Sequence, residues 1–288
     1  MSTEEPTHLY GSATTPPLSA SDRRMSTEDL YARKGGVPIV CLTAYTTPMA
    51  QYLDHHSDLL LVGDSLAMVI YGLDTTVGIT IETMIAHGQA VMRGSTKACV
   101  MVDMPFGTYE DSWQQALGSA RRIIDETGAQ AVKMEGGVNI AGSIQRIVED
   151  GIPVCGHVGL LPQKVTKAGG FKIQGRDDEG AKQILADAVA VSDAGAFNMV
   201  VEGTVEPLAR LITETVRVPT IGIGASAACD GQVLVTQDML GLFSDFTPKF
   251  VKRYAEVGIA IEKAVSSFAE EVRARRFPEP QHTFPEKK

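Results

Sequence analysis

Five apolar runs in the sequence each end on an ionisable side chain, and this pattern limits the fold more than any other feature. A continuous apolar run is typical of a parallel strand that is buried on both faces. In a (β/α)8 barrel the catalytic groups lie at the carboxyl ends of such strands, so all five side chains are expected at one mouth. The five residues are Asp64, Asp103, Glu135, His157 and Glu202.

Apolar runs and helical patterns alternate along the chain, which predicts an α/β protein built as a (β/α)8 TIM barrel, with a doubly wound sheet as the competing architecture. Strands are expected at Pro38–Thr43, Asp58–Gly63, Lys97–Asp103, Gln130–Glu135, Pro153–His157, Phe197–Glu202, Thr220–Gly224 and Gln232–Thr236. Apolar residues three and four positions apart predict helices at Ile81–Arg93, Ser112–Glu126, Ile140–Asp150, Gly180–Ala194 and Glu206–Val216.

Composition excludes several classes of partner. The 288 residues carry a net charge of -9, so we expect neither nucleic acid nor an anionic membrane surface as a main partner. No apolar stretch approaches the roughly 18 residues of a membrane span, and no segment of signal type opens the sequence. The four cysteines form no C-x-x-C pair, as expected of buried free thiols in a reducing compartment. A cytoplasmic protein is expected.

The chain is expected to hold one domain. Residues 1–24 are rich in Ser, Thr, Pro and Glu and predict a disordered N-terminal extension, whereas residues 25–288 predict a single barrel domain with a long C-terminal helix. That helix is expected from about Pro248 to Arg276. Its apolar stripe is longer than one barrel groove can cover. The helix is therefore expected to pack either on its own barrel or on a second subunit. The stripe consists of Phe250, Tyr254, Val257, Ile261, Val265, Phe268 and Val272.

Three of the carboxylates indicate a hard divalent cation. Asp64, Asp103 and Glu135 follow adjacent strands, and a ligand set made only of oxygen favours Mg²⁺ over Zn²⁺. Such a cation can bind an α-keto acid through its carboxylate and keto oxygens, and it stabilises the enolate that the acid forms.

The remaining candidates are assigned to the substrate. Lys133 lies inside an apolar strand and therefore needs an anionic partner. Ser65 and His157 are candidate contacts to the substrate carboxylate, although a turn hydroxyl and a structural histidine would explain either one taken alone. Glu202 follows the apolar run Met199-Val200-Val201 and is the candidate general base. A salt bridge to a neighbouring strand is its alternative role.

Two connections are candidate ligand loops. The longest runs from His157 to about Asp178 and is rich in Gly, Lys and Gln, so it is interpreted either as a substrate loop over the mouth or as an exposed loop. The turn Gly222-Ile223-Gly224-Ala225-Ser226 is similar to a phosphate-binding turn, but glycines there also allow close approach of the backbone to any substrate.

From about Leu30 to Phe284 the sequence resembles the ketopantoate hydroxymethyltransferase family. The motifs that carry the resemblance are Thr43-Ala44-Tyr45, Val62-Gly63-Asp64-Ser65-Leu66, Asp103-Met104-Pro105-Phe106-Gly107, Val132-Lys133-Met134-Glu135-Gly136-Gly137, Gly156-His157-Val158-Gly159-Leu160, Gly169–Arg176, Gly222-Ile223-Gly224-Ala225 and Pro248–Tyr254. The resemblance implies a barrel of the isocitrate lyase/phosphoenolpyruvate mutase type. It also implies the first step of pantothenate synthesis, in which 3-methyl-2-oxobutanoate takes the one-carbon unit of 5,10-methylenetetrahydrofolate to give 2-dehydropantoate and tetrahydrofolate.

Residue by residue, the resemblance implies that Asp64, Asp103 and Glu135 bind Mg²⁺, directly or through water, and that Glu202 accepts the proton. It assigns Asp64, Ser65, Asp103 and Lys133 to the keto-acid site, and it implies a homodecamer. The sequence departs from the family pattern outside this set, at Thr46, Ala67, Gly78 and Ser226.

Two alternatives stay open. The first is a carbon–carbon lyase of the isocitrate lyase type, because Cys155-Gly156-His157 is similar to the cysteine motif of that enzyme. The lyase has lysines just before the cysteine, whereas Pro153 and Val154 stand here, so Cys155 is better interpreted as a buried strand residue. The second is a catalytically silent keto-acid-binding barrel, which the intact set of acids disfavours.

Overall fold

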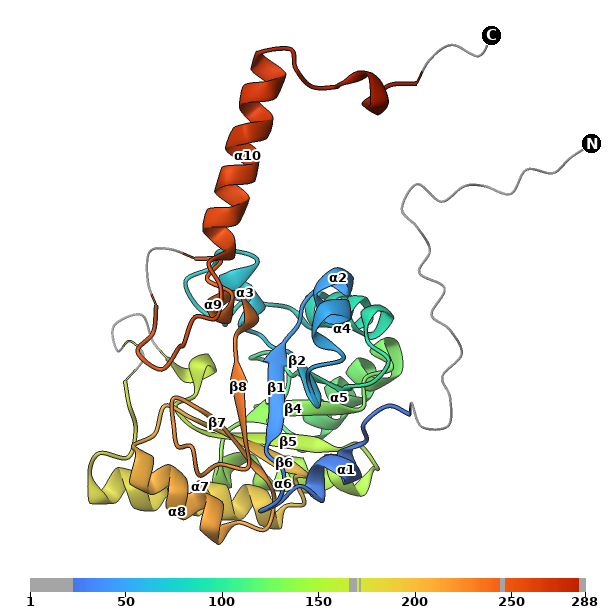
Figure 1. The fold of residues 1–288 in the computed structure, drawn as a ribbon. Helices are drawn as coiled ribbons and strands as arrows, with labels where there is room; N and C mark the ends of the chain where they lie inside the picture. Colours follow the sequence, from blue (N-terminus) through green and yellow to red (C-terminus); the bar gives the residue numbers. More distant parts are fainter. Residues whose placement is uncertain (1–22, 166–169, 171, 244–246, 285–288) are drawn as a thin grey trace, which may run out of the picture.

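The protein forms a closed barrel of eight parallel strands, in which each strand pairs with its sequence neighbours and the last closes on the first (Figure 1). The computed structural model describes residues 23–165, 170, 172–243 and 247–284. The strands are β1 (Ile39–Thr43), β2 (Leu59–Val62), β3 (Cys99–Asp103), β4 (Ala131–Glu135), β5 (Val154–Gly159), β6 (Asn198–Glu202), β7 (Thr220–Ile223) and β8 (Gly231–Leu234). The predicted barrel is confirmed, and the doubly wound sheet is wrong.

Successive residues of each strand face alternately into the barrel and out toward the helices. On β6, Met199 and Val201 pack in the outer core, whereas Val200 belongs to the interior cluster. Glu202 therefore points inward with Val200. Leu30 of the short helix α1 (Thr27–Tyr31) joins the same interior cluster, so α1 closes the amino end of the barrel and leaves the carboxyl end for the site.

Helices cover most of the outside of the barrel. They are α2 (Thr47–Leu53), α3 (Leu66–Val69), α4 (Ile81–Gly94), α5 (Trp113–Thr127), α6 (Val138–Glu149), α7 (Asp178–Asp193), α8 (Glu206–Thr215) and α9 (Thr236–Met239). From α4 to α8 each helix packs on the next, and α2 packs on α4. Side chains cap several of them: Thr46, Thr80, Ser112 and Asp177 each accept a hydrogen bond from a first-turn N–H.

The last helix begins later than the stripe predicts. It is α10 (Val257–Arg273), and the backbone before it is held by the end of α9. The Tyr254 N–H donates to the carbonyl of Met239 at 2.8 Å, and the Val257 N–H donates to that of Leu240 at 2.9 Å. If the helix began at Pro248, these N–H groups would instead donate to carbonyl groups of the helix itself. The predicted start is therefore wrong by about nine residues.

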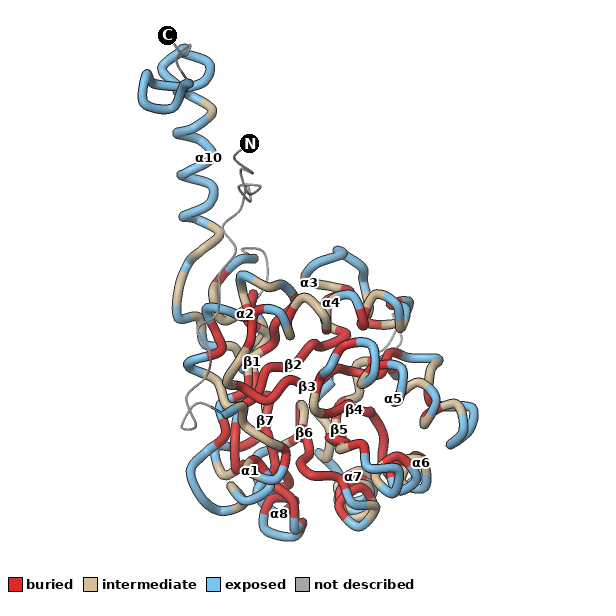
Figure 2. Tube along the Cα trace, turned by 90° about the vertical axis from the view of Figure 1, so that its right-hand side faces the viewer, coloured by how far each residue is buried: buried red, intermediate tan, exposed pale blue. Residues whose placement is uncertain are grey.

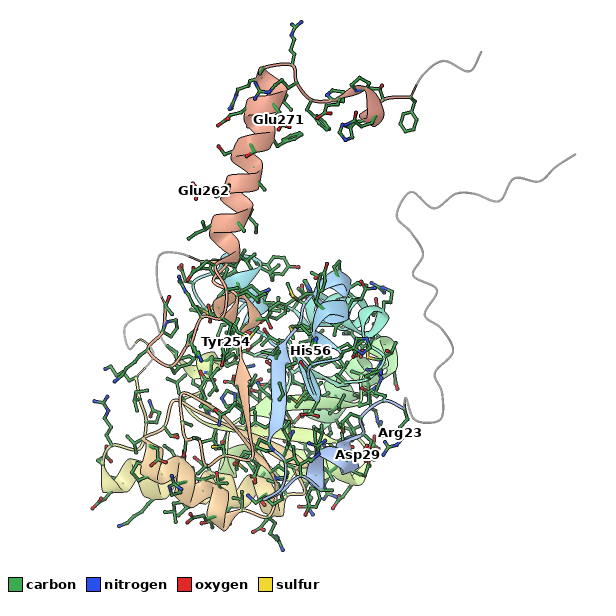
Figure 3. All side chains as sticks on the ribbon, in the orientation of Figure 1. Arg23, Asp29, His56, Tyr254, Glu262 and Glu271 are labelled. Carbon is green, nitrogen blue, oxygen red and sulfur yellow. The ribbon has the colours of Figure 1, made fainter. Side chains whose placement is uncertain are left out.

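Helix α10 projects away from the barrel, and none of its residues is buried (Figure 2). Its apolar stripe stays open, with Val265 60% and Phe268 53% exposed. Glu262 and Glu271 also lie on this projecting part (Figure 3). The prediction that the helix packs on its own barrel is therefore wrong.

The outer face of β1 and β8 lacks the cover that the other strands have. Every residue of β2, β3, β4 and β7 is buried, whereas Val40 on β1 is 46% exposed. Gln232 on β8 is exposed as well. In a (β/α)8 barrel the helix that follows β8 normally covers this face. The molecule thus has an uncovered strand pair and an uncovered helix.

Two residues that were assigned to the N-terminal extension contact the barrel. The Arg24 guanidinium donates to Ser95 Oγ at 2.9 Å and to the Ala98 carbonyl at 2.6 Å. Arg23 forms an ion pair with Asp29 at 2.5 Å (Figure 3). Arg23 and Arg24 thus belong to the packed chain, and residues 1–22 of the predicted extension lie outside the described residues.

Two expectations from composition can be compared with the structure. Within the described part of the chain, no helix combines the length and the apolar character needed to cross a membrane. The four cysteines are free thiols, and all four are buried.

Candidate active site

The carboxyl ends of the strands surround a cavity of about 150 Å³. All the residues that the sequence indicates for the site line it, which brings together side chains from five strands. They are Asp64, Ser65, Asp103, Lys133, Glu135, His157 and Glu202.

Lys133 and Asp103 form a buried ion pair at the base of this cavity. Lys133 Nζ contacts Asp103 Oδ1, and Asp103 Oδ2 accepts a hydrogen bond from the Asp64 backbone N–H at 2.9 Å. Burial acts to lower the pKa of Lys133, but Asp103, Glu135 and Asp64 outweigh burial and raise it. The anionic partner that the strand position of Lys133 requires is therefore Asp103.

The surroundings of Asp64 favour the protonated form of its carboxyl group and raise its pKa. Burial, followed by the charges of Asp103 and Glu135, raises the pKa of Asp64 to about 8. A cation placed among these carboxylates would favour the ionised form of all three.

His157 lies between two carboxylates. Its Nδ1 is 3.3 Å from Glu135 Oε1, and its Nε2 is 3.2 Å from Glu202 Oε2. Burial acts to lower the pKa of His157, but Glu135 more than offsets this effect and the pKa rises to about 9. His157 is therefore an imidazolium at neutral pH and links Glu135 to the candidate base. The salt bridge considered as the alternative role of Glu202 is present, with His157 as its partner.

Glu202 is the carboxylate of this set that is most open to the mouth. Its side chain is 18% exposed, whereas the Glu135 side chain is 2% exposed. Of the apolar run before Glu202, only Val200 lines the cavity with it, because Met199 and Val201 face the helices. The carboxylate is therefore reachable by a substrate that enters from the carboxyl end of the barrel.

Gln163 is a site residue that sequence reasoning missed. It lies in the short helix η1 (Pro162–Lys164) after β5 and is buried. Its Nε2 donates to Asp64 Oδ2 at 2.8 Å and to the Met104 carbonyl at 3.0 Å, while its backbone N–H donates to Glu135 Oε2 at 3.0 Å. Its only sequence signal is that it follows a strand end in the loop interpreted as a substrate loop. The structure makes it the link between two of the acids.

Ser65 is oriented by Tyr45, which belongs to the motif that follows β1. The two hydroxyl oxygens are 2.8 Å apart, and Tyr45 is buried. Burial raises the pKa of Tyr45, so its hydroxyl keeps its proton. Ser65 is therefore held at the rim of the cavity by a buried partner.

The side of the cavity formed by β6, β7 and β8 is mainly apolar, with Val200, Ile223, Val233, Val235 and Phe250. Phe250 was expected in the helix stripe, and that prediction is wrong. Its ring lies over Gly224, where a Cβ would come within 3.1 Å of the ring and where φ is +58°. Glycine at this turn thus makes room for the aromatic side chain. In the same turn, the Ser226 hydroxyl donates to Glu206 at 2.7 Å and fastens the turn to α8.

The carboxylates suit Mg²⁺, although they are not gathered into a ready-made ligand cage. Asp64, Asp103 and Glu135 all line the cavity, and their carboxylate oxygens are the hard ligands that Mg²⁺ prefers. Among the described residues, no three His, Cys, Asp or Glu side chains stand close enough to hold a metal ion together. This set fits a cation that binds through few protein oxygens and keeps several water molecules, as Mg²⁺ does.

Solved structures of other enzymes share this fold. A 2,3-dimethylmalate lyase, described as a PEP mutase/isocitrate lyase superfamily member, aligns with a TM-score of 0.56 at 15% identity over 89% of this chain and 91% of its own. A phosphonopyruvate hydrolase complex with oxalate and Mg²⁺ aligns with a TM-score of 0.56 at 12% identity, over 89% and 92%. At these identities the likeness concerns the fold alone.

Sequence relatives identify the family. The chain is 60% identical over 267 residues to 3-methyl-2-oxobutanoate hydroxymethyltransferase of Sinorhizobium medicae, covering 93% of this chain and 98% of the relative. It is 58% identical over 262 residues to the protein of the same name from Brucella canis, covering 91% and 95%. The family model for ketopantoate hydroxymethyltransferase matches residues 24–280. The chain therefore belongs to the ketopantoate hydroxymethyltransferase family and is an enzyme that transfers hydroxymethyl groups.

Proposed function

We propose that this enzyme joins C3 of 3-methyl-2-oxobutanoate to the one-carbon unit of 5,10-methylenetetrahydrofolate in the first step of pantothenate synthesis. One water is consumed, and the products are 2-dehydropantoate and tetrahydrofolate. The new bond links C3 to the one-carbon unit, and the water oxygen becomes the product hydroxyl. The observation that carries the proposal is the position of Glu202, open to the cavity and facing a set of buried carboxylates.

Glu202 is the group that removes the C3 proton. It is the carboxylate nearest the mouth, and the His157 imidazolium fixes its position through Nε2. A positioned base of this kind supplies on the order of 10²–10⁴ in rate. His157 acts on Glu202 rather than on the substrate carboxylate, because both of its ring nitrogens face carboxylates of the protein.

Asp64, Asp103 and Glu135 would hold Mg²⁺, directly or through water. When bound, the cation would polarise the keto group and neutralise the charge that develops on its oxygen. Lys133 pairs with Asp103 and holds its side chain in place. Ser65 offers its hydroxyl to the keto acid carboxylate from the rim, where Tyr45 orients it.

The apolar side of the cavity receives the two methyl groups on C3. Val200 and Ile223 lie on the two strands nearest the base, and Phe250 closes the same side from above Gly224. This arrangement presents the C3–H bond to Glu202 while the keto and carboxylate oxygens face the acids. It accounts for a substrate that is polar at one end and branched at the other.

Deuterium exchange tests the proposal. Wild-type enzyme with Mg²⁺ in deuterium oxide is expected to exchange the C3 proton of 3-methyl-2-oxobutanoate, followed by NMR. Glu202→Gln is expected to lose on the order of 10²–10⁴ of this rate while the keto acid still binds in a calorimetric titration. Glu214→Gln is a matched control, because Glu214 is exposed on α8 and does not line the cavity.

Exchange at the wild-type rate in Glu202→Gln would remove Glu202 from the role of base. If wild type with Mg²⁺ formed no 2-dehydropantoate from the two substrates, the proposed reaction itself would be wrong. Cleavage of a larger hydroxy acid instead would favour the lyase. Against that alternative, Cys155 is buried within β5 and its thiol donates to the Gly156 carbonyl.

The enzyme is also proposed to assemble from several copies of itself, with the decamer implied by the family as the expected size. The support is the pairing of two uncovered surfaces: the stripe of α10 and the outer face of β1 and β8. An α10 from a second copy would cover Val40 as the eighth helix of a barrel covers its own strands. Burial of one such apolar side chain contributes roughly 1.5–3 kcal/mol to the free energy of association.

The assembly is tested from both surfaces. Phe268→Asp/Val272→Asp on the helix and, separately, Val40→Asp on β1 are each expected to lower the mass measured by light scattering. The control is Glu262→Gln/Glu271→Gln, which changes two residues of the same projecting helix that do not belong to its apolar stripe (Figure 3). A wild-type monomer, or an unchanged oligomer in both test variants, would contradict the assembly.

A further inference from the structure

The long connection between β5 and α7 has two arms, an outgoing arm that follows β5 and a returning arm that precedes α7, and both contact the end of β6 near Glu202. On the outgoing arm, the Leu160 N–H donates to the Glu202 carbonyl at 2.8 Å. On the returning arm, the Gln174 N–H donates to the Gly203 carbonyl at 2.7 Å, and Gln174 forms a parallel bridge with Thr204. Both arms are therefore fixed to the segment that carries the proposed base.

The outgoing arm can run so close to β6 only because Gly159 has no side chain. Its φ is +93°, and a Cβ there would lie 2.4 Å from the Glu202 carbonyl oxygen. The arm then continues into η1, where Pro162 lines the reaction cavity. The start of this connection is thus part of the wall between the reaction cavity and the outside.

A second cavity, of about 310 Å³, lies between the two arms. Its described lining combines apolar Leu160, Leu161 and Val165 from the outgoing arm with Lys164 and, from the returning arm, Lys172. The volume is at the lower end of the range for small-molecule sites. The cavity therefore adjoins the reaction centre and presents both an apolar surface and two cations.

The local charge is opposite to that of the whole chain. The net charge of the protein is -9, yet the sequence from Gly151 to Arg176 has no Asp or Glu. Lys164 and Lys172 are both exposed, and neither forms an ion pair within the described residues. Two unpaired ammonium groups at the rim of a cavity favour a ligand that brings carboxylates or phosphates.

We infer that this second cavity holds the glutamate tail of the folate co-substrate, with Lys164 and Lys172 facing its carboxylates. The inference rests on the proposed function, which requires the one-carbon carrier to reach C3 beside Glu202. The outer end of that carrier carries one or more glutamates. A tail lying between the two arms runs outward from the reaction centre along Leu161 and Val165.

The test compares the folate tail with the lysines. KM for the carrier is measured with 5,10-methylenetetrahydropteroate, which has no glutamate, and with the mono- and triglutamate forms. Wild-type KM is expected to fall as glutamates are added. Lys164→Gln and Lys172→Gln are each expected to raise the KM of the triglutamate by roughly 2- to 5-fold, as partly exposed ion pairs do. Lys182→Gln, on α7 outside this cavity, is the charge-matched control.

The decisive result is how the KM of the carrier depends on its number of glutamates in the double variant. Lys164→Gln/Lys172→Gln is expected to bind all three carriers with nearly equal KM, while the KM of the keto acid and its C3 exchange stay as in wild type. A double variant that keeps the full tail dependence, or a loss that Lys182→Gln reproduces, would overturn the inference. Absent product formation in wild type would instead count against the proposed function.

Discussion

Replacing Gln163 by leucine should separate the chemistry of the site from the stability of the barrel. The side-chain amide donates to Asp64 Oδ2 at 2.8 Å and to the Met104 carbonyl at 3.0 Å. Leucine keeps most of the volume and removes both of these hydrogen bonds, together with the side-chain oxygen that accepts a hydrogen bond from the Tyr109 hydroxyl. The backbone N–H that serves Glu135 is retained, so the loop keeps one of its attachments.

The size of the effect follows from the kind of hydrogen bond that is lost. A hydrogen bond to a charged group contributes about 1.5–3 kcal/mol. If Asp64 must hold its position most firmly in the transition state, kcat/KM for the keto acid falls by roughly 10- to 150-fold. The Mg²⁺ concentration for half-maximal activity should rise as well, because Asp64 is a proposed ligand.

Gln130→Leu is the matched control. Gln130 Oε1 accepts a hydrogen bond from the Val100 N–H at 2.8 Å, and its Nε2 donates to the Gly128 carbonyl at 3.1 Å, away from the cavity. It should lower the melting temperature while kcat/KM stays within about 3-fold of wild type. A Gln163→Leu enzyme with wild-type kcat/KM, or an equal kinetic loss in both variants, would refute the reasoning.

Three further results are expected. Asp54→Asn should lower the free energy of unfolding at pH 7 by about 2–5 kcal/mol, because buried Asp54 accepts hydrogen bonds from Ser95 and from backbone N–H groups. These bonds outweigh burial and lower the pKa of Asp54 in the folded protein. The difference in melting temperature between variant and wild type should therefore begin to shrink as the pH falls below about 4, the pKa of an unfolded Asp, and close as the pH falls through the lower folded-state pKa. Deletion of residues 1–24 should lower the melting temperature more than deletion of residues 1–22, since only the longer deletion removes Arg24 and its bonds to Ser95 and Ala98. Asp103→Asn should lose Mg²⁺ affinity and turnover together; wild-type Mg²⁺ affinity in a calorimetric titration would contradict its assignment as a ligand.

Most of the fold could be predicted because the barrel is encoded locally. The buried strands are mainly apolar runs, with Lys133 inside β4 as an exception, and each predicted strand or barrel helix up to α8 lies within two residues of the observed one. The start of α10 could not be predicted in this way. Phe250 and Tyr254 fit the helical period, but carbonyl groups at the end of α9 compete for the backbone donors, and that competition is tertiary.

The polar half of the site was predictable for a related reason. Asp64, Asp103, Glu135, His157 and Glu202 each lie within two residues of the carboxyl end of a strand, so the closed barrel brings them together whatever the loops do. The hydrogen bonds and ion pairs among these residues could not be predicted from their positions in the sequence. That His157 would face two carboxylates depends on side-chain direction across three strands, which period and spacing do not specify.

The apolar half of the site has no distinctive sequence signal. Val200, Ile223 and Val233 point into the barrel like the residues that merely fill it, and only their height along the strands places them at the cavity. Phe250 reaches the cavity from a segment beyond β8, over a turn where glycine leaves room for its ring. The candidate acids can therefore be recognised in the sequence, while the apolar surface proposed to select a branched keto acid is indistinguishable from core until the barrel closes. A substitution such as Val200→Ala would change substrate preference without touching any residue that the sequence marks as functional.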